Sequence, residues 1–66
     1  MYSVADYEKA IENTPKKWKG LPLRQVGNKA ICMSRRYNKE TKTMRTLYSK
    51  WDNGIYYFVV ENGIIL

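Results

Sequence analysis

Cationic and aromatic side chains alternate along the middle of this 66-residue chain, and together they are suited to binding anions. Residues 14–50 carry eleven lysines and arginines against one carboxylate, Glu40, whereas residues 1–13 and residues 51–66 each carry a net charge of −2. The overall charge of +6 is therefore segregated along the chain, and it sets up a directional electrostatic field. Because cations contact phosphates and flat side chains stack on bases or sugars, the pattern predicts binding to nucleic acid.

The predicted contact residues are basic and aromatic side chains on an uncovered sheet face and around a loop at residues 38–42. They are Arg35, Arg36, Lys39, Lys42, Arg45, Tyr48, Lys50 and Tyr57. Among them, Tyr48 and Tyr57 would stack on bases or contact sugars, and the cations beside the loop would contact phosphates. The alternative is that the same lysines and arginines only form a solvent-exposed surface that protects the edge of the sheet.

A secondary basic patch, formed by Lys16, Lys17 and Lys19, surrounds Trp18. The indole either stacks on a base or closes the hydrophobic core beside a helix end, and the burial habits of tryptophan favour the core. If Trp18 is buried, we expect the lysine heads to extend outward into solvent.

Catalytic and metal-binding chemistry has little support among the remaining residues. The chain has no histidine and a single cysteine, Cys32, which excludes Ser-His and Cys-His arrangements, zinc fingers and intrachain disulfides. Its six carboxylates form no pair in the strand register described below, so a general acid/base dyad is not expected. We therefore expect no enzyme activity, no cofactor and no metal site.

Two classes of partner remain open. One is nucleic acid, contacted mainly through its backbone, and the other is an acidic surface of a larger host protein, because Tyr, Met and Arg are also enriched in protein interfaces. The second class would make the chain an inhibitor or adaptor, of the kind a phage or mobile element supplies. The longest apolar run, residues 55–60, is too short to span a bilayer, so we expect no membrane partner. The cysteine content fits a reducing cytoplasm.

An N-terminal helix over about residues 4–13 is predicted by its cap and its periodicity. Ser3 is a good N-cap, Asp6 lies in the first turn, and apolar residues recur at helical spacing. Because the residue before a proline avoids helical dihedrals, Thr14 and Pro15 end the helix. Residues 14–20 then form a basic connector within a single small domain.

Residues 21–66 predict an antiparallel β-meander of four or five strands. Turn signals at Gly27-Asn28, residues 38–42, Asn53-Gly54 and Asn62-Gly63 separate segments rich in β-branched and aromatic residues. One short helix covers one face of such a sheet, so the predicted class is α+β with an open second face. A small SH3-like β-barrel is the alternative. The register of the first strand stays open.

The turns also predict which side chains share a face. A two-residue turn at Asn53-Gly54 opposes Trp51 to Tyr56 and Leu47 to Val60, and a five-residue loop at 38–42 opposes Met33 to Leu47. The predicted core face then carries Ile31, Met33, Leu47, Trp51, Tyr56, Phe58 and Val60. The predicted open face carries Ala30, Cys32, Ser34, Arg36, Met44, Thr46, Tyr48, Lys50, Tyr57 and Val59. The last turn opposes Glu61 to Ile64 and Val60 to Ile65, giving a short edge strand, so we expect a monomer or an edge-strand homodimer.

Overall fold

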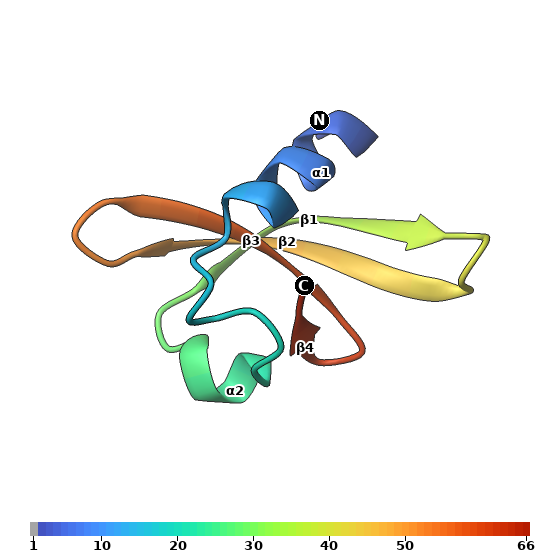
Figure 1. Ribbon diagram of the computed structural model, residues 1–66. Coiled ribbons are helices and arrows are strands. Elements are labelled where there is room, and N and C mark those ends of the chain that lie inside the picture. Colours follow the sequence, from blue (N-terminus) through green and yellow to red (C-terminus); the bar gives the residue numbers. More distant parts are fainter. Residues whose placement is uncertain (1) are drawn as a thin grey trace.

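The computed structural model describes residues 2–66 and contains two helices and a four-stranded antiparallel sheet (Figure 1). The elements are α1 (Val4–Asn13), α2 (Leu23–Val26), β1 (Ile31–Asn38), β2 (Thr43–Trp51), β3 (Ile55–Glu61) and β4 (Ile64–Ile65). The strands lie in the order β1-β2-β3-β4, so the predicted α+β meander is confirmed, and the sheet is not closed into a barrel. Among the described residues, no helix has the length and apolarity to cross a membrane.

Helix α1 begins and ends where its local signals predict. The Ser3 hydroxyl accepts a hydrogen bond from the Asp6 N–H at 3.3 Å, and the Asp6 carboxylate accepts one from the Ser3 N–H at 2.8 Å. This reciprocal pair satisfies two of the N–H groups that a helix start leaves free. At the other end, the Thr14 hydroxyl donates to the Ala10 carbonyl at 2.7 Å, and Pro15 follows.

The meander was predicted to begin at residue 21, but its first strand begins at Ile31. Residues 21–30 form a loop and the short helix α2. Residues 20–23 instead run along the outer edge of β4. Gly20 N–H donates to the Ile65 carbonyl at 2.8 Å, Ile65 N–H donates to Leu21 at 3.0 Å, and Leu23 N–H donates to Gly63 at 2.8 Å. The outer edge of β4 is therefore already hydrogen-bonded.

Both faces of the sheet are covered, each by its own hydrophobic cluster. On one face, Tyr7 and Ala10 of α1 pack with Leu47 and Val59. On the other, the buried residues are Trp18, Phe58, Val60 and Ile65, with α2 packed beside them. Figure 1 shows α1 and α2 on opposite sides of the sheet, because residues 14–22 cross from one side to the other. The prediction of one open face is wrong for the central part of the sheet.

The register between β2 and β3 differs from the prediction by one residue. Leu47 lies opposite Val59, and Trp51 opposite Ile55. The turn between them is a three-residue loop, in which Asn53 has φ 58° and Gly54 has φ 143°, and not a two-residue turn. A slip of one residue moves every side chain of β3 to the other face relative to β2.

Between β1 and β2 the prediction is right at one end and wrong at the other. Ile31 lies opposite Ser49 and Cys32 opposite Tyr48, as predicted. A β-bulge at Met33 then shifts the pairing, so that Ser34 lies opposite Leu47. The loop beyond spans four residues, 39–42, and not five.

Several residues assigned to one core face therefore lie elsewhere. Ile31, Met33 and Trp51 are exposed, whereas Phe58 and Val60 belong to the cluster around Trp18. The last hairpin is confirmed, with Glu61 opposite Ile64 and Val60 opposite Ile65. Its turn residues, Asn62 and Gly63, have φ values of 55° and 77°, which Asn and Gly tolerate best.

Candidate functional site

The predicted contact residues divide between the two faces of the sheet. We call the face under α1 the helix face and the opposite one the Trp18 face. Opposed residues of an antiparallel pair share a face, so Arg36, Arg45 and Tyr57 lie on the helix face. By the same pairing, Arg35, Tyr48 and Lys50 lie on the Trp18 face. The structure does not bring Tyr48 and Tyr57 together on one surface, contrary to prediction.

Tyr48 and Lys50 are engaged in internal contacts. The Tyr48 ring stacks on Phe58, with the ring centroids 5.6 Å apart and an angle of 15° between the planes. The Lys50 ammonium donates to the backbone carbonyl of Asn28. Tyr48 therefore supports the Trp18 core, and its packed ring is not free to stack on a base.

The secondary basic patch lies around a buried tryptophan. The Trp18 indole meets Phe58 edge-on at a centroid distance of 5.7 Å, and it is almost fully buried. Lys19 donates to the Ile11 carbonyl at 2.6 Å, a favourable position for a cation at a helix C-terminus. Lys17 lies 3.9 Å from Asp52, in the loop between β2 and β3. Trp18 thus closes the core, and Lys17 lies at the end of β2 remote from loop 39–42.

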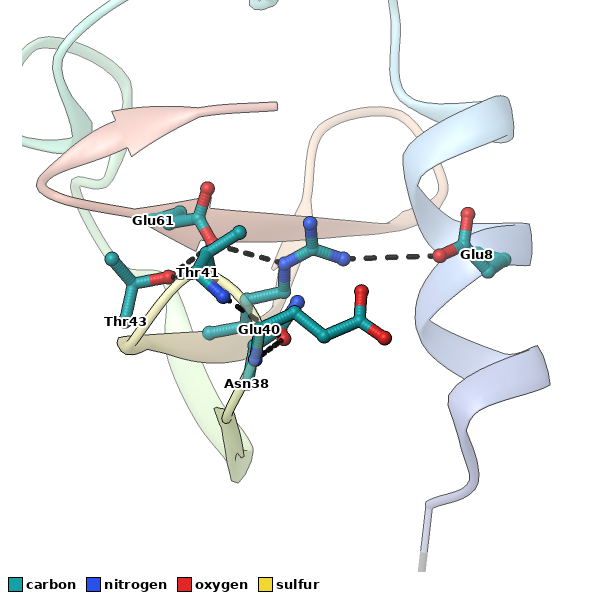
Figure 2. A network of polar contacts seen from close by, with 7 residues as sticks. Glu8, Asn38, Glu40, Thr41, Thr43 and Glu61 are labelled. Atoms are coloured by element: carbon teal, nitrogen blue, oxygen red, sulfur yellow. Dashed lines mark hydrogen bonds and ion pairs between the residues drawn. The ribbon is translucent and has the colours of Figure 1, made fainter.

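Arg45 is held by carboxylates at the base of the β1–β2 hairpin. Its Nε donates to Glu61 at 3.0 Å, and its guanidinium lies 3.8 Å from a carboxylate oxygen of Glu8. The Thr43 hydroxyl donates to the same Glu61 oxygen at 2.6 Å, and Figure 2 shows Glu8 and Glu61 on either side of this network. The Thr43 and Arg45 hydrogen bonds lower the pKa of Glu61 below its ordinary value of 4.5. Arg45 therefore positions the hairpin and is not a free phosphate ligand.

The loop that follows β1 is ordered by its own side chains. The Asn38 side-chain carbonyl accepts hydrogen bonds from the N–H groups of Glu40, at 2.9 Å, and Thr41, at 3.4 Å (Figure 2). The hydroxyls of Thr41 and Thr43 lie 2.6 Å apart, which links the loop to the Glu61 network. These contacts give the loop a defined shape before it meets any partner.

Four cations of this hairpin remain unpaired. We call residues 35–44 the hairpin tip. Within residues 2–66, the side chains of its four cations form no hydrogen bond or ion pair, and all four are exposed. They are Arg35, Arg36, Lys39 and Lys42. All four belong to the predicted contact residues, and they lie together at one end of the sheet.

Tyr37 is an exposed aromatic residue of the hairpin tip that was not among the predicted contact residues. Its side chain is 53% exposed, and it lies opposite Met44, which is 48% exposed, on the Trp18 face of the tip. Arg35 lies on the same face, two residues away along β1. Tyr37 is the one aromatic residue between Ile31 and Leu47, and its place beside a basic loop was the available signal.

The two sides of the hairpin tip differ in charge. On the helix side, a groove of about 390 Å³ lies between the tip and α1. Its lining includes two carboxylates, three cations and part of Tyr37; the charged residues are Glu8, Glu40, Arg36, Lys39 and Arg45. On that side, the two carboxylates offset part of the attraction that the cations exert on a phosphate. The other side, with Arg35, Tyr37 and Met44, includes no carboxylate from the tip strands, so an anion is favoured there.

A metal site at the hairpin tip would require several ligand side chains close together. In the part of the chain that the structure describes, no group of three or more His, Cys, Asp or Glu side chains is arranged to hold a metal ion. Comparison of the chain with protein-family models, curated proteins and solved structures finds no match. What the hairpin tip offers is a combination of exposed cations, one exposed aromatic ring and an ordered loop.

Proposed function

We propose that this chain is a non-enzymatic binding protein that contacts double-stranded nucleic acid through the hairpin tip. The observation that carries the proposal is that the hairpin tip holds four exposed, unpaired cations and the exposed ring of Tyr37 at one end of the sheet. The secondary basic patch and the central sheet are less suited to contact with a nucleic acid, because the rings of Trp18 and Tyr48 are packed against Phe58 inside the protein.

The shape of the tip supports a duplex partner. Arg45 opposite Glu61 is the last pair that β2 makes with β3, and beyond it β1 and β2 continue as a two-stranded ribbon. Figure 1 shows this ribbon extending away from α1 and from the short strand β4. The major groove of a B-form duplex is wide enough to admit a two-stranded β-ribbon, with phosphates on both sides.

The electrostatics support a mode of binding dominated by the phosphate backbone. Each cation that neutralises a phosphate releases counterions, so affinity falls steeply as salt rises. Arg35 and Tyr37 share the side without carboxylates, and we assign Arg35 to a phosphate and Tyr37 to a sugar or base edge. Because the Arg45 network orders the base of the ribbon, less conformational freedom is lost on binding.

A salt titration of binding to duplex and single-stranded oligonucleotides tests the proposal. We expect binding at low salt, a steep loss as salt rises, and preference for the duplex. Arg35→Ala should flatten the slope of log K against log salt by about 1. Tyr37→Ala should weaken binding with little change in slope, because it removes no charge.

Two results would count against this function. Absence of binding at low salt contradicts it outright. A protein partner captured in stoichiometric amount from nuclease-treated lysate, and lost with Arg35→Ala, would favour the inhibitor or adaptor hypothesis in its place. We expect the protein to act in a reducing cytoplasm, since Cys32 is exposed and the chain has no second cysteine.

A further inference from the structure

A second exposed surface lies on the helix face at the end of the sheet opposite the hairpin tip. Trp51 is 72% exposed, Ile55 62%, Ile31 63% and Tyr57 43%. Trp51 pairs with Ile55, and Ser49 lies between Ile31 and Tyr57 on neighbouring strands, so the four side chains are adjacent on one face. Helix α1 packs on Leu47 and Val59, further along the sheet, and leaves these four uncovered. We call them the Trp51 patch.

The Trp51 patch is large for a chain of this size. Side chains of this kind have full areas of roughly 150–250 Å², so the four expose on the order of 450 Å². Contiguous apolar patches of a few hundred Å² on a soluble protein commonly mark interaction sites. The patch carries no unpaired cation, and Asp52 adjoins it, so a nucleic acid is disfavoured and an apolar protein surface is favoured.

We propose that the Trp51 patch is the interface of a homodimer, in which two copies pack face to face about a two-fold axis. A two-fold interface must contain both a protrusion and the recess that receives it. Here the protrusion is the exposed Trp51 indole. The recess is a groove of about 320 Å³ between α1 and β3, lined by Ala10, Leu47, Ile55 and Tyr57 among others. Because Ile55 pairs with Trp51, protrusion and recess are neighbours on one surface.

Charges around the patch complement each other across such an axis. Asp52 directly follows Trp51, and Lys9 lines the groove beside Asp6, whose carboxylate already accepts hydrogen bonds from Ser3. When Trp51 enters the groove of the second copy, Asp52 comes within reach of Lys9 of that copy, and symmetry makes the contact twice. The present partner of Asp52 is Lys17 at 3.9 Å, an exposed pair that contributes little and is easily exchanged. The basic hairpin tips lie at the remote ends of the dimer, where their mutual repulsion is weak.

Area and edge geometry favour this arrangement over the predicted edge-strand dimer. A stable interface buries roughly 800 Å² per partner, of which the patch supplies about half, and the groove walls are available for the rest. The outer edge of β4 is hydrogen-bonded to residues 20–23. The outer edge of β1 is interrupted by the bulge at Met33 and carries Arg35 and Arg36, features that protect an edge from pairing.

Sedimentation equilibrium tests the dimer directly. From about 1 µM to about 1 mM protein, we expect the mass to rise from 7.8 kDa toward twice that value. Trp51→Ser should weaken association at least about 30-fold, as expected for a central aromatic anchor. Asp52→Lys and Lys9→Asp should each weaken it several-fold, and the double variant should restore it, since the two reversed charges again attract.

The controls separate dimerisation from folding. Met44→Ser removes an apolar side chain that is 48% exposed, but at the hairpin tip, and should leave association unchanged. Circular dichroism on dilute samples should show the same melting temperature for every variant. The proposal is wrong if the wild type stays at 7.8 kDa at the highest concentration, or if Trp51→Ser associates as tightly as the wild type. It is also wrong if the double charge reversal fails to restore association. None of these outcomes bears on nucleic-acid binding by the hairpin tip.

Discussion

Arg45 Nε donates to the Glu61 carboxylate across a distance of 3.0 Å and so joins β2 to β3 where the sheet gives way to the two-stranded hairpin tip. The Thr43 hydroxyl shares the same carboxylate oxygen, and Glu8 brings α1 to the other side of the guanidinium. Three elements thus meet at one arginine. The orientation of the four free cations relative to the body of the protein depends on this junction.

Replacing Arg45 should destabilise the fold more than replacing its neighbour. Arg45→Ala leaves Glu61, a largely buried carboxylate, without its charged donor, and should lower the free energy of unfolding by roughly 1 to 2 kcal/mol. Arg36 lies directly opposite Arg45 on β1 but is exposed and unpaired, so Arg36→Ala should change stability by less than about 0.5 kcal/mol. Urea unfolding of both variants measures the difference. Equal losses would contradict the assigned role of Arg45.

Stability should fall in acid through two carboxylates. Hydrogen bonds from Ser3 lower the pKa of Asp6, and those from Thr43 and Arg45 lower the pKa of Glu61, relative to ordinary values of 3.8 and 4.5. A group whose pKa is lower in the folded state stabilises the fold above the ordinary pKa, and that contribution is lost as pH falls through the lowered value. We expect constant urea midpoints from pH 7 to about pH 5 and a decline below it, smaller in Glu61→Gln.

Truncating the two tryptophans should lower the free energy of unfolding by very different amounts. Trp18→Ala removes a buried ring that meets Phe58 and Tyr56, and should cost roughly 3 to 5 kcal/mol, a large share of the stability of a small domain. Trp51→Ala removes an exposed ring and should cost less than about 0.5 kcal/mol at low micromolar concentration. Urea unfolding followed by circular dichroism compares them. A larger loss with Trp51→Ala would overturn the assignment of Trp18 to the core.

The contact between Tyr7 of α1 and Ser34 of β1 should couple measurably. Their hydroxyl oxygens lie 2.6 Å apart in a partly buried setting. In a double-mutant cycle of Tyr7→Phe and Ser34→Ala, we expect a coupling free energy of about 1 kcal/mol. Coupling near zero would mean that this pair of hydroxyls does not help to hold α1 against β1.

Local signals were sufficient to predict α1 and the last hairpin. The cap formed by Ser3 and Asp6, the stop at Pro15 and the turn at Asn62-Gly63 each act within a few residues. Their energies do not depend on distant parts of the chain. The boundaries of α1 and the pairing of β3 with β4 therefore agree with prediction.

The register of β3 depended on a turn sequence that serves two geometries. Asp52-Asn53-Gly54 suits both a two-residue Asn-Gly turn and the three-residue loop that forms, because Asn53 tolerates positive φ in either. The residues of β3 did not indicate which of the two registers forms, because the consecutive residues Phe58 and Val59 are both apolar and both fully buried. That uninterrupted apolar run is typical of a strand covered on both faces, and it was the signal for a second covering layer. Helix α2 itself is too short to show periodicity.

The free cations of the hairpin tip were predictable because they lie beside an exposed loop. The role of Arg45 was not, since it depends on Glu8 and Glu61, which only the folded chain brings near it. The same holds for Tyr48, whose ring is taken up by Phe58 once the register is fixed. Tertiary contacts that the sequence does not reveal thus engage Arg45 and Tyr48, two of the predicted contact residues, inside the protein.

The central claim is that the hairpin tip, and not the net charge of the chain, binds nucleic acid. The most direct test compares duplex binding across salt concentrations for two double variants that each remove two positive charges. Arg35→Ala with Lys42→Ala alters the tip, and Lys16→Ala with Lys17→Ala alters the patch around Trp18. We expect the tip variant to flatten the salt slope by about 2 and the patch variant to leave it close to the wild type. Equal slopes for the two variants would contradict the claim.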